Sequence, residues 1–225
     1  MLIRIIGRSV PTDEMSQYLE LLDWRRRVAM LYGEVRARPH SDATAAWFRD
    51  RRDRLFREHP QSPIPAHTRD SFRSLGYWPW NAAGRVEARF RPALEDAVGS
   101  DAASINAGEA RLHSIGTAEF ELFDVPCELR VLWLEAYGGG VFIPFRDATS
   151  GAESYGGGRY LVDSVKGADL GSSYDQDVIT LDFNYAYHPS CAYDPIWPCP
   201  LAPPENRLPM PVRLGERLTM DARPL

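Results

Sequence analysis

The spacing of apolar residues changes once along this chain, near residue 76, and this change limits the possible folds more than any other feature. Before it, apolar residues recur at steps of mostly three and four, which is the period of an amphipathic helix. After it, they form short runs bounded by Gly, Pro and Asp, which are typical of strands. The pattern predicts helices at residues 13–36, 42–58 and 68–75. It predicts strands at residues 86–90, 118–123, 128–137, 141–145, 160–163 and 178–184.

This order of elements predicts an α+β protein, in which N-terminal helices pack on an antiparallel β-rich sandwich or partly open barrel. A length of 225 residues suits one large structural unit. Within it we distinguish a helical segment, residues 1–75, from a β-rich core, residues 76–225. Nine of the 18 prolines follow residue 187, so the end of the chain is expected to form an ordered wrap, with residues 210–214 as an edge strand. The charged string at residues 49–54 is expected to be mostly solvated.

Composition excludes several classes of protein. Hydrophobic residues make up 44% of the chain and aromatic residues 11%, which excludes disorder along its whole length. The longest apolar stretches are about five residues, whereas a membrane span needs ~20. The first ten residues lack the apolar core of a secretory signal, so we expect a cytoplasmic protein with no membrane partner. A net charge of −5 argues against a nucleic-acid partner.

The charge is distributed unevenly along the chain. Residues 1–75 hold 14 arginines against 10 acidic residues, and the remainder is strongly acidic. The two parts can therefore attract each other, either within one chain or between copies. These charges are compatible with a monomer and with a homo-oligomer.

A polar cluster around residues 146–160 is the best candidate for a functional site. The string Tyr-Gly-Gly-Gly occurs at residues 137–140 and again at 155–158, and glycine allows a backbone to approach a ligand closely. The guanidinium of Arg146 or Arg159 suits a carboxylate or phosphate. From this cluster and the strand that follows, we expect ligand-binding residues at Arg146, Tyr155, Gly157, Arg159 and Asn184.

Three carboxylates in the same regions are candidates for acid or base catalysis. They are Asp147, Glu153 and Asp182. In the string DFN, the alternation of a strand would send Asp182 and Asn184 to one face and Phe183 to the other. The same polar residues can instead satisfy backbone groups in turns, and an Arg–Asp pair can be purely structural. The sequence is compatible with a catalytic role and with a structural role for these residues.

Metal, cofactor and nucleophile motifs give weaker signals. His188, Cys191 and Cys199 carry zinc-ligand chemistry, but a fourth ligand and a known spacing are missing, so they are weak metal candidates and no metal is predicted. Cys191 and Cys199 can instead be free thiols or form a disulfide with each other. No phosphate-binding glycine loop and no G-x-S-x-G elbow occurs. We therefore predict no cofactor and no identifiable nucleophile.

Three strings resemble a bacterial family known as the domain of unknown function numbered 1684. They are IPFRDATSGAESYGGGRYL at residues 143–161, LDFNYAYHPSCAY at 181–193 and CPLAPPENRL at 199–208. Weaker similarity extends the resemblance over most of residues 48–217. His188 departs from it, because that family usually places Asn before this Pro. The resemblance implies a bacterial, largely β protein and carries no established activity.

Taken together, these features predict a protein that binds a small ligand, for which arginines would favour an anion and a carboxylate would supply acid or base catalysis. The alternative is a non-enzymatic interaction or assembly module in which the same polar residues are structural. Whether the protein is an enzyme stays open at this point.

Overall fold

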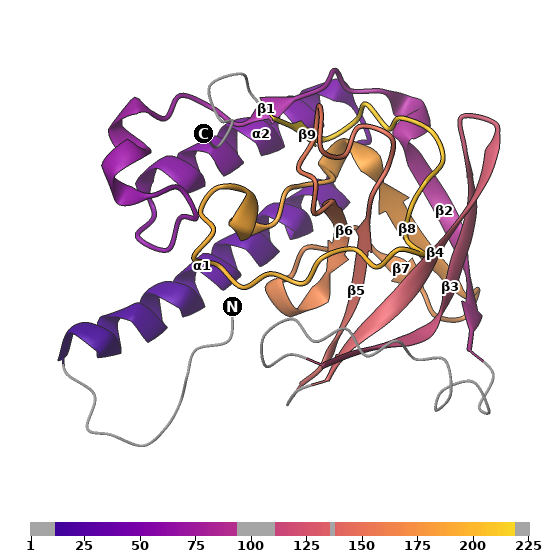
Figure 1. Ribbon diagram of the computed structural model, residues 1–225, viewed down its shortest axis with the longest axis horizontal. Coiled ribbons are helices and arrows are strands. Elements are labelled where there is room, and N and C mark those ends of the chain that lie inside the picture. Colours follow the sequence, from indigo (N-terminus) through magenta and orange to yellow (C-terminus); the bar gives the residue numbers. More distant parts are fainter. Residues whose placement is uncertain (1–11, 94–110, 136–137, 219–225) are drawn as a thin grey trace.

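The computed structural model describes residues 12–93, 111–135 and 138–218. Two helices, α1 (Thr12–Ala37) and α2 (Asp42–Glu58), lie together beside one curled antiparallel sheet (Figure 1). This arrangement confirms the predicted α+β fold. No helix of the described residues is long and apolar enough to cross a membrane.

The two long helices occupy the predicted ranges to within one residue at each end. Ser41 begins α2 because its side chain accepts the backbone N–H of Thr44 at 3.2 Å, which satisfies one of the free amides of the first turn. The helix ends at Glu58, just before the proline-containing string. The third predicted helix is instead a short 3-10 segment, Ala66–Ser71, and the chain is already extended at Phe72.

Seven strands form the sheet in the order β6-β5-β4-β3-β2-β8-β7, and every neighbouring pair is antiparallel. Register shifts leave an extra residue in β3 and in β6, which bends these strands. An isolated bridge between Tyr160 and Tyr187 brings the β6 edge against the segment that follows β8. The sheet therefore curls into a half-barrel. Its strands are β2 (Arg85–Pro92), β3 (Arg111–Leu122), β4 (Val125–Glu135), β5 (Gly140–Phe145), β6 (Arg159–Asp163), β7 (Ser172–Ser173) and β8 (Val178–Asp182).

Two strand predictions ran too far. The predicted strand at 178–184 ends at Asp182, because the Asp182 carboxylate accepts the Asn184 N–H and starts a 3-10 turn, Phe183–Tyr185. The prediction at 118–123 included Phe123, which lies with Asp124 in the left-handed turn that joins β3 to β4. Of the predicted strand at 128–137, residues 136 and 137 lie outside the described part.

The proline-rich end of the chain wraps across the molecule, as predicted, but residues 210–214 are not a strand. The wrap makes single hydrogen bonds to the sheet, such as that from the Leu208 N–H to the Arg146 carbonyl at 2.8 Å. It then forms a short strand, β9 (Glu216–Arg217), which pairs with β1 (Gly76–Tyr77).

The apolar residues form two main layers. One fills the half-barrel between the sheet and the wrap, around Leu129, Ile143 and Phe183. The other lies between the helices and the opposite face of the strands, around Tyr32, Phe48 and Phe142. The second layer forms one side of the candidate site.

Candidate functional site

The predicted polar cluster contains a buried ion pair between Asp147 and Arg159. Their side chains are 0% and 1% exposed, and an Arg159 Nη2 atom lies 2.7 Å from Asp147 Oδ2. The remaining hydrogens of the two terminal nitrogens of Arg159 point to backbone carbonyls of Val212, Leu214 and Glu216. The guanidinium therefore ties the C-terminal wrap to β6 and has no terminal donor left for a ligand.

Asp147 is equally occupied by protein groups. Its Oδ1 accepts the backbone N–H of Thr149 at 2.8 Å and the Thr149 hydroxyl, and its Oδ2 accepts the Val212 N–H at 3.0 Å. Burial lowers the pKa of Arg159, although Asp147 opposes this shift. All of these partners are protein groups. The arrangement agrees with the structural role that was given above as the alternative to a ligand site.

Of the other predicted residues of the motif, Tyr155 and Gly157 lie together and Arg146 is near enough to lower the pKa of Tyr155, whereas Glu153 has a partner at the surface. Glu153 is exposed and forms a bidentate pair with Arg213 at 2.7 and 2.9 Å, and this partner lowers the pKa of Glu153. Arg146 is partly buried, and its Nε has no hydrogen-bond partner among the described residues. Gly157 is buried beside the ring of Tyr155, and a Cβ there would lie 2.5 Å from that ring.

Asp182 and Asn184 do come together, through the 3-10 turn rather than through strand alternation. The Asn184 side chain donates to Asp182 Oδ1 at 2.8 Å. It also pairs with the backbone of Asn81, accepting its N–H at 2.9 Å and donating to its carbonyl at 2.8 Å. Asp182 Oδ2 lies 3.0 Å from His40 Nε2. These residues fasten the chain before β2 to the end of β8.

The weak metal candidates have different partners. His188 Nε2 accepts the backbone N–H of Tyr155 at 3.2 Å, whereas the sulfur of Cys199 accepts the N–H of Cys191 at 3.3 Å. Among the residues that the structure describes, no group of three or more His, Cys, Asp or Glu side chains could hold a metal ion. All three cysteines are free.

Glu216 is a buried centre that the sequence analysis missed. Its carboxylate, 1% exposed, receives Arg52 at 2.6 and 2.8 Å, the Tyr193 hydroxyl at 2.6 Å and the His188 N–H at 2.7 Å. Burial alone would raise the pKa of Glu216, but Arg52 and its other partners hold it below its usual value. Arg52 was predicted to be solvated. Arg52 is buried because it lies on the face of α2 that is directed toward β9, where it pairs with Glu216.

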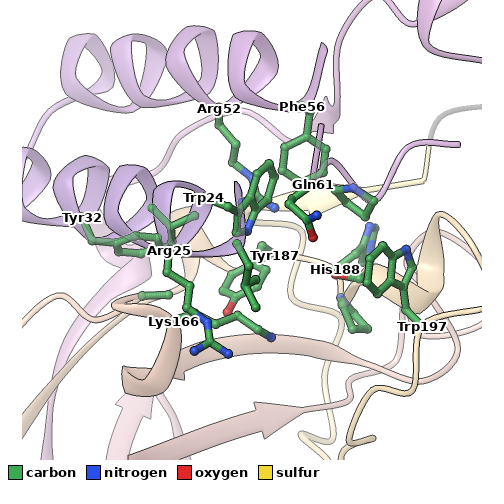
Figure 2. A pocket seen from close by; sticks show the side chains of 16 residues that line it. Trp24, Arg25, Tyr32, Arg52, Phe56, Gln61, Lys166, Tyr187, His188 and Trp197 are labelled. Atoms are coloured by element: carbon green, nitrogen blue, oxygen red, sulfur yellow. The ribbon is translucent and has the colours of Figure 1, made fainter. Parts of the chain in front are cut away.

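Next to this centre, a cavity of about 60 Å³ lies between the helices and the β-rich core. Figure 2 shows side chains of α1 and α2 on one side of it and residues of the core on the other. The described side chains around it are mostly aromatic, apolar or basic, with the neutral polar Gln61 and Ser190, and none of them is acidic. They are Leu21, Trp24, Arg25, Val28, Tyr32, Arg52, Phe56, Gln61, Pro63, Lys166, Ala168, Tyr187, His188, Pro189, Ser190 and Trp197.

Three polar atoms of this lining are buried without a hydrogen-bond partner in the described part of the chain. They are the hydroxyls of Tyr32 and Tyr187 and the indole Nε1 of Trp197. Burial raises the pKa of both tyrosines above the usual value, so both hydroxyls are protonated at neutral pH and can donate. Buried polar groups in folded proteins are nearly always paired, which marks these atoms as unusual.

The charges of the lining are all positive, and they differ in how far they are neutralised. Arg52 is paired with Glu216. Lys166, the one lysine of the sequence, lies 2.8 Å from Asp163; burial lowers the pKa of Lys166, but Asp163 raises it to a net value above the usual one. Arg25 is partly buried and has no ion-pair partner among the described residues. The guanidinium of Arg25 therefore lines the cavity without a counter-ion among the described residues.

Of the predicted site residues, only His188 lines this cavity, and its pKa is lowered to about 4. The cause is chiefly burial, so His188 is neutral at pH 7. Tyr32 and Arg25 were missed because no local motif distinguishes them from the other residues of an amphipathic helix. Lys166 is the one lysine of the sequence, but this fact alone indicates neither a function nor a partner.

The fold and the cavity define a class of protein: a curled antiparallel half-barrel closed by a C-terminal wrap, with two N-terminal helices covering a small basic cavity. A model of the family described as "Protein of unknown function (DUF1684)" matches residues 70–217. The chain therefore belongs to this family, as the resemblance of its motifs implied.

The chain is also similar to a solved structure, the solution NMR structure of the uncharacterized protein from gene locus rrnAC0354 of Haloarcula marismortui. The two share 35% sequence identity over 78% of this chain and 93% of that chain, with a TM-score of 0.57. No curated protein matches. The matched family region includes Lys166, Tyr187 and Glu216, whereas Arg25, Tyr32 and Arg52 precede it.

Proposed function

We propose that this protein binds a small anionic molecule in the cavity between α1, α2 and the β-rich core. One observation carries the proposal: Tyr32 and Tyr187 line a cavity whose charged lining is entirely basic, and the hydroxyl of each is buried without a hydrogen-bond partner among the described residues. A buried donor without an acceptor costs about 1–3 kcal/mol. An anion would accept from both hydroxyls and remove that cost.

The size of the cavity limits the group that it can hold. Each water needs at least about 10–15 Å³ of such volume, so 60 Å³ takes about four water-sized groups. A phosphate or a short carboxylate has this size. The rings of Trp24 and Phe56 add apolar surface to the lining, and less polar surroundings strengthen the attraction between an anion and Arg25 or Lys166.

Native mass spectrometry of the purified protein, paired with its denatured mass, tests the proposal first. We expect a non-covalent adduct that is lost on denaturation and whose mass identifies the ligand. Titration of the ligand-free protein with inorganic phosphate and with acetate, followed by calorimetry and thermal unfolding, then measures binding to the same cavity.

Tyr187→Phe and Arg25→Met should weaken binding of the anion, while Tyr174→Phe should not, because Tyr174 is 94% exposed and does not line the cavity. The proposal fails if neither anion binds, no adduct is found, and Tyr187→Phe leaves the melting temperature unchanged. The cavity would then hold only water.

A second candidate function, partner binding, rests on the outer face of α1. Leu19, Leu22 and Met30 are 65%, 51% and 62% exposed there, and monomeric proteins usually bury side chains of this size. This exposure favours the interaction or assembly module. Light scattering across micromolar concentrations tests it: self-association that Leu22→Arg abolishes supports an assembly, and a monomer at all concentrations contradicts it.

A further inference from the structure

Cys191 and Cys199 are brought together by the wrap, although eight positions separate them. The backbone N–H of Cys191 donates to the sulfur of Cys199 at 3.3 Å, and the Cys191 thiol is a hydrogen-bond partner of the same sulfur. Both residues are partly exposed, so small molecules can reach them. The third cysteine, Cys127 in β4, is buried, donates to the carbonyl of Val125 at 3.4 Å and also has a hydrogen bond with the backbone of Leu122.

The surroundings make the two thiols unequal. Hydrogen bonds from the Cys191 thiol and N–H, together with the nearby charge of Lys166, lower the pKa of Cys199 to about 6 against the effect of burial. The Cys191 thiol donates to Cys199, which raises its own pKa. Cys199 is therefore largely a thiolate at neutral pH, and the thiolate is the reactive form of cysteine.

We infer that Cys191 and Cys199 form a redox-active dithiol that reduces low-molecular-weight disulfides and is itself oxidised to an intramolecular disulfide. The Cys199 thiolate attacks one sulfur of the small disulfide; a mixed disulfide forms and one small thiolate leaves. Cys191 then loses its proton and attacks the Cys199 sulfur, which releases the second small thiolate. The protein loses two electrons and the Cys191 proton, and the small disulfide is reduced to two thiolates, which become thiols by taking up that proton and one from solvent.

The disulfide would join the ends of a segment that contributes to the cavity. Trp197 lies between the two cysteines, and Ser190 directly precedes them; both line the cavity. Oxidation would therefore restrain one wall of the proposed ligand site. The thiol chemistry itself does not depend on any ligand being bound there.

Oxidised glutathione is the probe that tests this inference. The reduced full-length protein is mixed with it at pH 7, free thiols are blocked with N-ethylmaleimide, and intact masses are measured. We expect wild type and Cys127→Ser to lose the mass of two hydrogen atoms and to leave Cys191 and Cys199 unblocked. Cys191→Ser should stop at a glutathione adduct on Cys199, because the second thiol is missing.

Cys199→Ser should react at least about tenfold more slowly than wild type, because it removes the thiolate. Circular dichroism of each variant checks that it is folded, and Cys127→Ser is the matched control for loss of a thiol. The inference is overturned if Cys199→Ser reacts as fast as wild type, if wild type stays at the glutathione adduct, or if oxidation joins two chains or involves Cys127.

Discussion

At the scale of single residues, the buried charges of this protein are held by several donors each. Arg159 joins Asp147 to three carbonyls of the wrap, and its guanidinium lies 4.9 Å from the rings of both Trp78 and Phe145. Arg52 and Glu216 form the second such pair. Removing one partner of a buried pair leaves the other charge unsolvated, which costs far more than losing a surface pair.

Arg159→Leu is therefore expected to lower the free energy of unfolding by about 3–5 kcal/mol, because it leaves Asp147 buried and unpaired. Urea unfolding at pH 7 measures this. Arg213→Leu is the matched control: it breaks the exposed pair with Glu153 and should leave the urea midpoint nearly unchanged. Equal effects of the two variants would contradict a structural role for Arg159.

His188 makes stability depend on pH. Its pKa is about 4 in the folded protein and about 6.5 in an unfolded chain, so between these values the unfolded chain binds a proton that the folded one does not. The contribution of His188 to the free energy of unfolding should therefore be constant above pH 6.5 and fall as the pH drops from 6.5 toward 4. Acidification through this window favours unfolding.

His188→Gln should flatten this dependence, because glutamine does not titrate and its carbonyl can still accept the Tyr155 N–H. Urea midpoints at pH 7.5 and pH 5 measure the difference. His67→Gln, at an exposed position, should keep the wild-type difference. A His188→Gln protein that loses as much stability at pH 5 as wild type would show that other groups are responsible.

At the scale of elements, side-chain amides of loop residues form backbone hydrogen bonds that a neighbouring strand would otherwise form. Asn206, which is fully buried, accepts the Arg130 N–H at 2.8 Å and donates to the carbonyls of Arg130 and Pro144 at 3.0 and 2.7 Å. β4 and β5 diverge here, and the amide spans the gap between them. Asn184 does the same for the backbone of Asn81.

Asn206→Ala should destabilise the protein by about 2–4 kcal/mol, because three backbone groups lose their partner at once. It should also speed hydrogen exchange at the Arg130 amide. Glu205→Ala, at the neighbouring exposed position, should change neither quantity measurably. If the Arg130 amide exchanges at the wild-type rate in Asn206→Ala, the bridging role of the amide is wrong.

At the scale of the whole molecule, the helices and the β-rich core depend on each other. The apolar layer beneath the helices includes Leu112, Leu132 and Phe142 of the strands, which would be exposed without the helices. Arg52 of α2 neutralises Glu216 of β9, and Arg36 of α1 lies 3.1 Å from Asp169. Two arginines of the basic N-terminal part therefore pair with acidic residues of the later part of the same chain.

A chain that begins at residue 59 should not form a stable monomer, because it exposes this layer and leaves Glu216 buried without its cation. Size-exclusion chromatography with light scattering, and thermal unfolding followed by circular dichroism, would show aggregation and no cooperative transition, whereas the full chain should unfold in one step. A monomeric fragment with a cooperative transition would show that the core is independent of the helices.

The sequence by itself determined the fold class, the two long helices, the approximate positions of most of the longer strands and the family. The short strands β1, β7 and β9 and the first part of β3 were not predicted. The predicted features are encoded locally, in periodicity, in a capping serine and in turn residues, so they can be read within short windows. An error in one strand boundary also has a local cause. β8 ends at Asp182, before the strand pattern of the sequence ends, because the Asp182 carboxylate accepts the backbone N–H of Asn184.

Only the tertiary structure decided which polar residues share a site. Arg52 and Glu216 are 164 positions apart, and nothing in the charged string of α2 marks Arg52 as the one to be buried. Tyr32 and Tyr187 meet one cavity because α1 packs on the segment that follows β8. Asp147 and Arg159 were separate candidates in the sequence. Their pairing and their shared contacts with Val212 depend on where the wrap docks, which no local pattern indicates.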